Sequence, residues 1–503
     1  MNRLVVVSNR VPLPPGRTQA GGLAVALDGL MEQRGGLWFG WSGAVVATDP
    51  GCRVTVRQET GIDYATIDLS EEEYASYYNN FSNAVLWPLL HTMPELMSFD
   101  RRDAEVYRAV NARMAATLQP LLRADDLVWL HDFHLLPLPA ALRALGVTHP
   151  IGFFLHVPFA SPDVLAAAPA MASLVRDVLA ADLIGFQTEN DLNNFAAAAE
   201  AFADATRLAA NVVMVNGRRV RLGVFPVEIE AHGFAEIAAR SATNGAAERL
   251  RASLRGQDLI LGVERLDPTK GLLQRLAALR RLLEQHPAWV RRATLLQIAA
   301  ESRKDVGLYR TLRATLDREA GRLNGDFAEP DWQPLRLVSR AVDRTLIAGY
   351  MRLARVGLVT PLRDGMNLVA KEFVAAQDPA DPGVLVLSRF AGAAQQLDAA
   401  LLINPHDTDA LAEAMLRALT MPLAERQERW EALWATIERR SPLAWGRAFV
   451  ATLLRAAAIG PVSVRPGALA AARPAATPRG RALMLPEHEP PRAQFLPERA
   501  KLN

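Results

Sequence analysis

The chain has 503 residues, of which 50% are hydrophobic and 22% charged. This is the balance of an ordinary globular protein, and the length predicts at least two domains. The net charge of +2, without a run of Lys and Arg, argues against a nucleic-acid partner. Cys52 is the single cysteine, so an intramolecular disulfide is excluded. We expect a cytoplasmic protein, because no segment has the pattern of a signal peptide or a membrane span.

Short apolar segments alternate with longer amphipathic ones along most of the chain. The predicted strands are Leu4–Val7, Leu127–Leu130, Ile151–Leu155, Leu183–Phe186, Arg219–Phe225, Leu259–Val263, Leu295–Ala299, Leu335–Val338, Val356–Val359 and Val384–Leu387. Helical patterns lie between many of them, including Leu272–Glu284 and Val306–Leu323. Such alternation predicts an α/β protein whose parallel sheets are covered on both faces. The strands suffice for two such sheets.

We predict two Rossmann-like, doubly wound domains that face each other across a cleft. Residues 1–235 form the first domain and residues 236–458 the second, with the last helix crossing back to the first. Residues 459–503 are rich in Pro, Ala and Arg. Such a composition buries too little apolar surface to offset the entropy of ordering, so we expect a disordered tail.

The predicted strands end in polar residues. These exits are Ser8-Asn9-Arg10, His131-Asp132-Phe133-His134, His156, Gln187-Thr188-Glu189, Glu264-Arg265, Ser302-Arg303 and Asp364. Ligands of open α/β sheets bind beyond the carboxyl ends of the strands. The pattern therefore predicts a polar, charged site between the two sheets.

The segment VGLVTPLRDGMNLVAKE, which begins at Val356, combines a strand, a loop and a helix. The helix is predicted over Met366–Gln377, directly after a loop that carries Asp364. Amides at the start of a helix are unpaired and attract anions or oxygen-rich groups. Asp364 and Glu372 can accept hydrogen bonds from sugar hydroxyls. The segment therefore suits a ligand that has both phosphate and sugar parts.

Several polar residues admit two interpretations. His131, Asp132 and His134 suggest a metal, but a clear third and fourth ligand is absent from the pattern, so Asp132 is better read as a hydroxyl acceptor. His156 is either a core histidine or a functional one. Arg265 and Lys270 suit a diphosphate, although a solvated helix start also fits.

Two aromatic residues and a pair of glycines also admit two interpretations. Tyr78 and Trp87 could be core residues or could line a sugar-phosphate pocket. Gly21-Gly22 could be a plain turn, or a place where the backbone approaches a ligand closely. No G-x-G-x-x-G follows the first strand, and no Walker A motif or G-x-S-x-G elbow occurs. Cys52 has no neighbours that would make it a nucleophile.

From Leu4 to about Leu454 the chain resembles the trehalose-6-phosphate synthases, which are retaining glycosyltransferases of the GT-B fold. The segments that carry the resemblance are VVVSNR, GGLAVAL, GLWFGWSG, YYNNFSNAVLWP, LVWLHDFHLLPLP, IGFFLHVPF, IGFQTENDLNNF, VERLDPTKGL, AGRLNG and VGLVTPLRDGMNLVAKEFVAAQ. The resemblance implies transfer of glucose from a nucleotide-glucose, commonly UDP-glucose, to glucose 6-phosphate. It also implies a homo-oligomer (a dimer or tetramer), no cofactor and no bound metal.

The resemblance implies a role for each matching residue. The implied catalytic residues are His156, Arg265, Lys270 and Asp364. The implied donor-binding residues are Gly22, Arg265, Lys270, Asp364, Gly365, Met366, Asn367, Leu368, Val369 and Glu372. The implied acceptor-binding residues are Arg10, Tyr78, Trp87, Asp132 and Arg303.

Three positions depart from the family pattern: Pro268 replaces an aromatic residue, Glu228 a glycine and Glu301 a proline. Pro268 restricts Asp267 before it, Glu228 lies near the expected hinge, and Glu301 lies close to Arg303, whose field it would weaken. Three other functions are considered: a glucosylglycerol-phosphate synthase that uses ADP-glucose, a non-catalytic sugar-phosphate-binding regulator, and a glycoside hydrolase. A fused phosphatase is not expected, because no D-x-D-G-T motif occurs.

Overall fold

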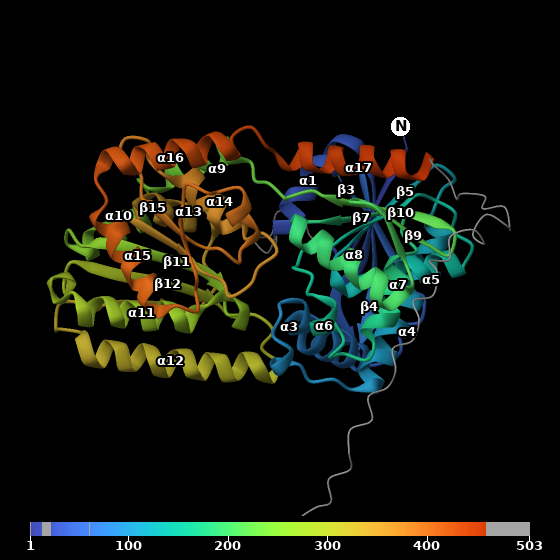
Figure 1. Cartoon of the computed structure of the whole chain (residues 1–503), viewed down its shortest axis with the longest axis horizontal. Coiled ribbons are helices and arrows are strands. Elements are labelled where there is room, and N and C mark those ends of the chain that lie inside the picture. Colours follow the sequence, from blue (N-terminus) through green and yellow to red (C-terminus); the bar gives the residue numbers. More distant parts are fainter. Residues whose placement is uncertain (1, 13–21, 60, 459–503) are drawn as a thin grey trace, which may run out of the picture. The chain divides into compact units, whose positions relative to one another are not determined.

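A computed structural model describes residues 2–12, 22–59 and 61–458, and the strands in this part of the chain form two sheets (Figure 1). Both sheets belong to one compact unit, Met1–Val462. We call them the N-terminal and the C-terminal sheet. The predicted tail, residues 459–503, lies outside the described residues, as does Gly21.

The N-terminal sheet has the strand order β3-β4-β2-β1-β5-β6-β7-β10-β9-β8. Its strands are β1 (Leu4–Arg10), β2 (Gly36–Val46), β3 (Thr55–Glu59), β4 (Ile62–Ser70), β5 (Leu127–His131), β6 (Ile151–Phe154), β7 (Leu183–Phe186), β8 (Thr206–Ala209), β9 (Val212–Val215) and β10 (Arg218–Val224). The central strands pair in parallel, whereas β3 with β4, β9 with β10 and β8 with β9 pair antiparallel. The antiparallel pairs therefore lie toward the edges.

The C-terminal sheet has the strand order β13-β12-β11-β14-β15-β16, and its strands all pair in parallel. Its strands are β11 (Asp258–Arg265), β12 (Ala293–Ala300), β13 (Leu335–Val338), β14 (Val356–Val359), β15 (Val384–Ser388) and β16 (Leu401–Ile403). The ten predicted strands are confirmed, with bounds within two residues except at the end of β1, which extends three residues beyond the predicted Val7. Strands β2, β3, β4, β8, β9 and β16 were not predicted. Among them, β3 is almost wholly exposed and polar, so it carries no apolar signal.

Alternating residues of each central strand enter different hydrophobic cores. In β1, Val5 and Val7 pack on one face, and Leu4 and Val6 on the other. Helices α4 (Arg101–Leu118), α5 (Leu138–Ala144), α7 (Met171–Val178) and α8 (Glu189–Ala203) contribute to the first core, and α1 (Gly22–Arg34) and α17 (Pro442–Ala458) to the second. Burial on both faces explains the near-continuous apolar sequence of these strands.

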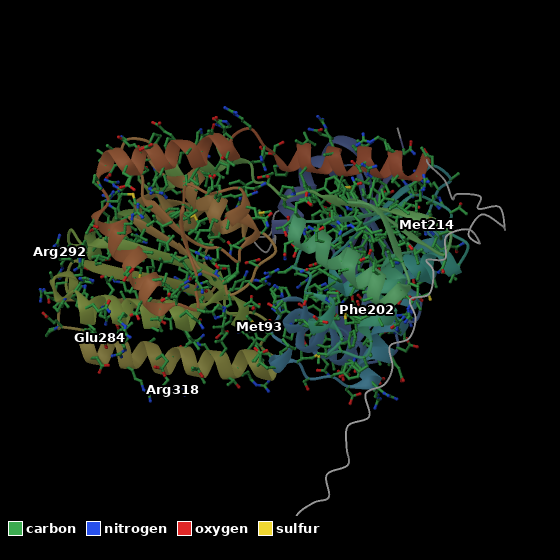
Figure 2. The ribbon with its side chains drawn as sticks, in the orientation of Figure 1. Met93, Phe202, Met214, Glu284, Arg292 and Arg318 are labelled. Atoms are coloured by element: carbon green, nitrogen blue, oxygen red, sulfur yellow. The ribbon has the colours of Figure 1, made fainter. Side chains whose placement is uncertain are left out.

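The C-terminal sheet is covered in the same way. Helices α11 (Leu272–Gln285), α12 (Gly307–Phe327) and α15 (Thr408–Thr420) share one core with it. Helices α9 (Ala231–Ser241), α10 (Gly245–Leu254), α13 (Arg344–Leu353), α14 (Leu368–Ala376) and α16 (Leu423–Ile437) share the other. Glu284 on α11 and Arg318 on α12 are exposed, and Figure 2 labels both side chains. The fold is thus the predicted pair of α/β sheets with helices on both faces.

The remaining helical segments are short or irregular. They are α2 (Glu71–Glu73), the π-helix η1 (Tyr74–Leu86), α3 (Trp87–Leu90), α6 (Pro162–Leu165) and the 3₁₀ turns Pro94–Leu96, Gln119–Leu121, Phe133–Leu135, Pro268–Lys270, Pro287–Trp289 and Gly392–Gln395. Two predicted helix boundaries were wrong: α12 ends at Phe327, not at Leu323, and α14 begins at Leu368, not at Met366. Asn367 has a left-handed backbone (φ 71°), which an α-helix cannot include.

Candidate active site

The predicted site residues of the N-terminal sheet lie at the carboxyl ends of its central strands. Arg10 ends β1 and His131 ends β5, Asp132 follows β5, and His156 follows β6 two residues on. In the C-terminal sheet, Arg265 ends β11. Parallel neighbours bring their carboxyl ends to the same edge of a sheet, which is why residues far apart in the sequence meet here.

A group of aromatic rings surrounds Arg10 and Tyr78. The Arg10 guanidinium lies 5.8 Å from the centroid of the Trp41 ring, and Trp41 lies 5.5 Å from the ring of Tyr78. Tyr78 stacks on His134 at 6.0 Å. Arg10 passes over Gly43, where an added Cβ would lie 2.6 Å from a guanidinium nitrogen. The guanidinium of Arg10 is therefore held against an aromatic wall.

The π-helix η1 positions Tyr78 in this wall. Long π-helices are rare, and short π-segments are frequent at functional sites. Tyr78 lies in the middle of η1, and Trp87 follows its last residue as the first residue of α3. Tyr74, the first residue of η1, donates from its hydroxyl to Asp305 Oδ2 at 2.9 Å. This bond joins η1 to the loop that precedes α12.

Trp87 lies at the centre of a cation–carboxylate group. Its indole N–H donates to Asp267 Oδ1 at 3.2 Å, and the guanidinium groups of Arg303 and Arg265 lie 3.9 and 5.6 Å from its ring centroid. Arg303 also pairs with Asp267 Oδ2 at 3.2 Å, and the hydroxyl of Tyr309 donates to the same oxygen at 3.1 Å. The structure thus joins a tryptophan of the N-terminal half to two arginines of the C-terminal half.

Asp267 is a site residue that the sequence analysis missed. It is 1% exposed, and its Oδ1 also accepts from the backbone N–H and the hydroxyl of Thr269. Burial alone would raise the pKa of Asp267, but Arg303, Arg265 and Lys270 hold that pKa below its usual value. The available signal was the Asp-Pro pair before a helical turn, a common N-cap pattern.

Lys270 is surrounded by carboxylates rather than by open solvent. Its ammonium pairs with Asp364 and lies 4.0 Å from Glu264 Oε2. The amide of Asn367 donates to Asp364 Oδ2 at 3.0 Å and to Glu264 Oε1 at 3.2 Å, and Arg275 pairs with Glu264 at 3.2 Å. Burial opposes the charged ammonium, but Asp364 and Glu264 raise the pKa of Lys270 above its usual value. Lys270 is therefore a fixed positive charge.

The loop that carries Asp364 approaches the N-terminal sheet closely. A Cβ added to Gly365 would lie 2.2 Å from the backbone oxygen of His156, so a larger residue would force the two loops apart. The backbone N–H of His156 donates to Asp132 Oδ1 at 3.2 Å. Burial raises the pKa of Asp132 to about 6, although backbone N–H groups of Phe133 and His156 oppose the shift. The predicted donor and acceptor residues thus meet at His156.

Three predicted site residues have a backbone conformation that is uncommon outside glycine. Asp132, Arg303 and Asn367 have φ of 78°, 50° and 71°, and they are among eight such residues in the described part of the chain. Conformations of this kind cost on the order of 1–3 kcal/mol and tend to occur at functional sites.

Other predicted residues lie apart from this centre. Glu372 on α14 accepts two hydrogen bonds from Arg344 of α13, at 2.8 and 3.2 Å. Burial raises the pKa of Glu372, and Arg344 partly offsets the shift. Gly22 begins α1, directly after residues that the structure does not describe.

The three departures from the family pattern have clear local partners. Asp267 before Pro268 is extended (φ −152°, ψ 135°), as the proline requires. Glu301 pairs with Lys304 at 2.5 Å and with Arg313 at 2.7 Å, so these two cations, rather than Arg303, neutralise its charge.

Glu228, the third residue that departs from the family pattern, is buried. It pairs with Lys371 of α14 at 2.5 Å and with Arg440 at 3.3 Å. Burial lowers the pKa of Lys371 to about 8, and the charge of Glu228 opposes that shift. The two segments that connect the sheets, one before α9 and one before α17, therefore share an ion cluster with α14, in which Glu228 and Lys371 are buried and Arg440 is exposed.

The metal interpretation of His131, Asp132 and His134 finds no geometric support in the described ranges, where no group of three His, Cys, Asp or Glu side chains is arranged around a common point.

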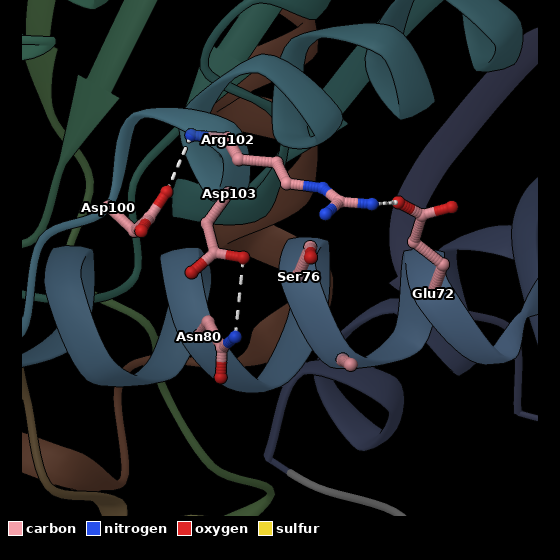
Figure 3. A pocket seen from close by; sticks show the side chains of 7 residues that line it. Glu72, Ser76, Asn80, Asp100, Arg102 and Asp103 are labelled. Atoms are coloured by element: carbon pink, nitrogen blue, oxygen red, sulfur yellow. Dashed lines mark hydrogen bonds and ion pairs between the residues drawn. The ribbon is translucent and has the colours of Figure 1, made fainter.

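A surface depression beside η1 is shown in Figure 3. It is lined by Glu72, Ala75, Ser76, Asn80, Asp100, Arg102 and Asp103. Its side chains bond to one another, for example Arg102 to Glu72 at 2.6 Å. None of the predicted site residues lines it.

The fold and the site define a GT-B glycosyltransferase: two Rossmann-like sheets, with cations and carboxylates where their strand ends meet. The model of glycosyltransferase family 20 matches residues 4–455, and the chain belongs to this family. Trehalose-6-phosphate synthase from Sinorhizobium fredii is 46% identical over 453 residues, which are 90% of this chain and 98% of the relative.

Two solved structures extend the comparison. An α,α-trehalose-phosphate synthase (UDP-forming) from Burkholderia xenovorans in complex with glucose-6-phosphate has a TM-score of 0.87 and 44% identity, over 90% of this chain and 100% of that one. The E. coli protein bound with UDP-2-fluoro glucose has a TM-score of 0.86 and 44% identity, over 90% of this chain and 99% of that one. These matches confirm the predicted family, the GT-B fold and the enzyme class, a trehalose-phosphate synthase. The roles of the individual residues stay predictions.

Proposed function

We propose that the protein transfers glucose from UDP-glucose to glucose 6-phosphate with retention, and releases α,α-trehalose 6-phosphate and UDP. The observation that carries the proposal is the meeting of two residue groups from different sheets. Arg265, Lys270 and Asp364 come from the C-terminal half, and this group meets Trp87 and His156 of the N-terminal half. A donor with a diphosphate and a sugar fits the first group, and a sugar acceptor fits the second.

Arg265 and Lys270 hold the donor diphosphate in this proposal. Lys270 is kept charged by its carboxylate neighbours, so it can stabilise the negative charge of the departing phosphate. The donor glucose lies against Asp364, the amides of Gly365, Met366 and Asn367, and His156. Glu372 accepts from the ribose hydroxyls, and the amides of Leu368 and Val369 at the start of α14 face the phosphates. Gly22 lets the backbone approach the donor.

The acceptor lies on the side of the N-terminal sheet. Arg10 and Arg303 bind its phosphate, because guanidinium groups match phosphate oxygens in charge and geometry. Tyr78 and Trp87 form the wall beside it. Asp132 accepts a hydrogen bond from a hydroxyl of the acceptor sugar.

The reaction proceeds on one face of the donor sugar. The acceptor hydroxyl attacks the anomeric carbon on the side from which the diphosphate leaves, and the leaving phosphate oxygen takes the hydroxyl proton. A new C–O bond forms, the bond to the diphosphate breaks, and configuration is retained. The protein supplies orientation and electrostatic stabilisation, so it needs no nucleophilic side chain.

The alternative functions make different demands on the site. A glycoside hydrolase needs two carboxylates flanking the bond to be cleaved. Asp364 is paired with Lys270, and Asp267 with Arg303, so neither is free for that task. A non-catalytic regulator would not require this set of buried, paired cations. A glucosylglycerol-phosphate synthase would use the same donor-side residues with another acceptor.

The test is an assay with purified full-length protein. UDP-glucose and ADP-glucose are each combined with glucose 6-phosphate or glycerol 3-phosphate, and released nucleotide and disaccharide phosphate are measured. We expect trehalose 6-phosphate and UDP from the first pair. Absence of nucleotide release with every combination would refute an enzyme, and preference for glycerol 3-phosphate with ADP-glucose would favour the alternative synthase.

The proposal also covers the cellular location, the oligomeric state and the domain boundaries of the enzyme. We propose a cytoplasmic homo-oligomer with domains 1–235 and 236–458, whose substrates are small molecules. Within the described ranges, no helix combines the length and the apolar character needed to cross a membrane. Gel filtration with light scattering measures the oligomeric state.

A further inference from the structure

His131 and His156 form a hydrogen-bonded pair of imidazoles beside the proposed donor glucose. His131 is 0% exposed, and its Nδ1 lies 3.0 Å from Nε2 of His156. The two rings are 5.3 Å apart at an interplanar angle of 29°. The register of the sheet sets this contact, because β5 and β6 pair in parallel with His131 opposite Phe154.

The proton in this pair can be on either ring, but the surroundings favour one arrangement. Both rings are neutral, since burial lowers the pKa of His131 well below its usual value and that of His156 to about 3. A neutral imidazole carries one N–H, so one ring donates and the other accepts. The choice therefore decides what each remaining ring nitrogen can do.

The other nitrogen of His131, Nε2, is buried and has no hydrogen-bond partner in the described part of the chain. If His156 were the donor, this nitrogen would carry a buried N–H without an acceptor. The neighbouring ring, Trp129 at 4.6 Å, holds an indole N–H that is also buried and unpaired and can only donate. A bare Nε2 leaves only an unused acceptor, whereas an N–H on it would add a second unmet buried donor beside the indole N–H.

His131 therefore carries its proton on Nδ1 and donates to Nε2 of His156. The proton of His156 is then on its own Nδ1, for which no protein partner is found among the described residues. The backbone N–H of His156 donates to Asp132, and its carbonyl oxygen lies close against Gly365. The ring is thus held between the acceptor-side aspartate and the donor-sugar loop.

We propose that His131 is a positioning residue that fixes the Nδ1–H tautomer of His156, so that His156 donates a hydrogen bond to a hydroxyl oxygen of the transferred glucose. The inference rests on the proposed function for the identity of that sugar. It also assigns a chemical role to His156: the ring is a hydrogen-bond donor and not a base.

The first test reads the tautomer directly in the free protein. Two-bond ¹H–¹⁵N correlation spectra of labelled protein distinguish an Nδ1–H from an Nε2–H imidazole, and the signal of His156 is assigned from its loss in His156→Gln. We expect the Nδ1–H form. An Nε2–H form would overturn the inference, whatever the activity of the enzyme.

The second test compares two substitutions of His131. In His131→Asn the amide nitrogen can replace Nδ1 as the donor, whereas His131→Leu removes the donor but stays apolar. We expect His131→Leu to lower kcat/KM for UDP-glucose about tenfold, which corresponds to about 1.4 kcal/mol, with the KM for glucose 6-phosphate unchanged. His131→Asn should recover most of the loss and keep the Nδ1–H signal.

Binding of UDP alone is the control, because UDP lacks the glucose that His156 contacts. Calorimetry should give the same UDP affinity for wild type, His131→Asn and His131→Leu. An equal loss of kcat/KM in both variants would overturn the inference. If His131→Leu does not fold, the wild-type tautomer and the His131→Asn variant still decide the question. If the wild-type protein releases no UDP, the proposed function is refuted, and the tautomer measurement still tests the inference by itself.

Discussion

Asp132 and Asp267 are two aspartates on opposite sides of the candidate site. Asp267 is buried and Asp132 is half-buried, and the charges around them differ. Asp267 pairs with Arg303 and has further positive charge nearby from Arg265 and Lys270, so its pKa is held low. Asp132 accepts mainly from backbone N–H groups, and burial raises its pKa to about 6. Neighbouring positive charge, rather than burial, therefore decides which carboxyl stays ionised at neutral pH.

The largest expected effect is the loss of charge at Asp267. Asp267→Asn leaves Arg303 and Arg265 without their shared counter-ion in a buried setting. Breaking a buried ion pair in this way costs about 3–5 kcal/mol, and we expect the free energy of unfolding in urea to fall by that order. The matched control is Asp305→Asn, which alters an exposed carboxylate that accepts from Tyr74. Similar losses in the free energy of unfolding of the two variants would show that the charge of Asp267 contributes no more to stability than that of an exposed carboxylate.

Removal of Arg303 tests the acceptor side of the comparison. Arg303→Ala removes a charged partner of the acceptor phosphate, which costs about 1.5–3 kcal/mol. Steady-state kinetics should show this as a higher KM for glucose 6-phosphate, with a much smaller change for UDP-glucose. Arg310→Ala, on the exposed part of α12, serves as the control. A larger effect on UDP-glucose would place Arg303 at the donor instead.

The raised pKa of Asp132 predicts an acid limb in the pH profile. Below about pH 6 its carboxyl is protonated and accepts hydrogen bonds less well, so kcat/KM should fall by up to about tenfold per pH unit. The phosphate of glucose 6-phosphate titrates in the same range. The comparison is therefore with Asp132→Asn, which keeps the substrate titration and should lose the additional limb. Identical profile shapes would remove Asp132 from the acceptor site.

The raised pKa of Asp132 also makes the free energy of unfolding depend on pH. The folded protein binds the Asp132 proton more tightly than the unfolded chain does. The contribution of this group to the free energy of unfolding is therefore greatest in acid, and it is lost as the pH rises through about 6.

The smallest expected effect concerns a third carboxylate, Glu372, whose cation is partly exposed. The side chain of Arg344 is 45% exposed, so its pair with Glu372 is screened by solvent. Arg344→Ala should raise the KM for UDP-glucose a few-fold at most, in line with about 0.2–1 kcal/mol for such pairs. Arg352→Ala on the same helix is the control. A loss as large as that of Arg303→Ala would show that Arg344 contacts the substrate.

The strands were predicted well where burial on both faces makes their sequence continuously apolar, as in β1 and β14. Strand β3 is almost fully exposed, and its residues carry no such signal. The start of α14 was misplaced by two residues because the left-handed conformation of Asn367 depends on its contacts with Asp364 and Glu264. Asp364 is a local neighbour, but Glu264 is 103 residues away in the sequence, so local sequence does not encode that second contact.

The sequence by itself determined the fold class and the residues at the strand exits, because apolar periodicity and strand-end polarity are local properties of the chain. Only the tertiary structure decided the partners. Asp267 became the counter-ion of Arg303, Trp87 came to lie beneath two guanidinium groups, and His131 came to bond to His156. These contacts join segments distant in sequence, and the pKa of each group follows from the charges that folding brings beside it.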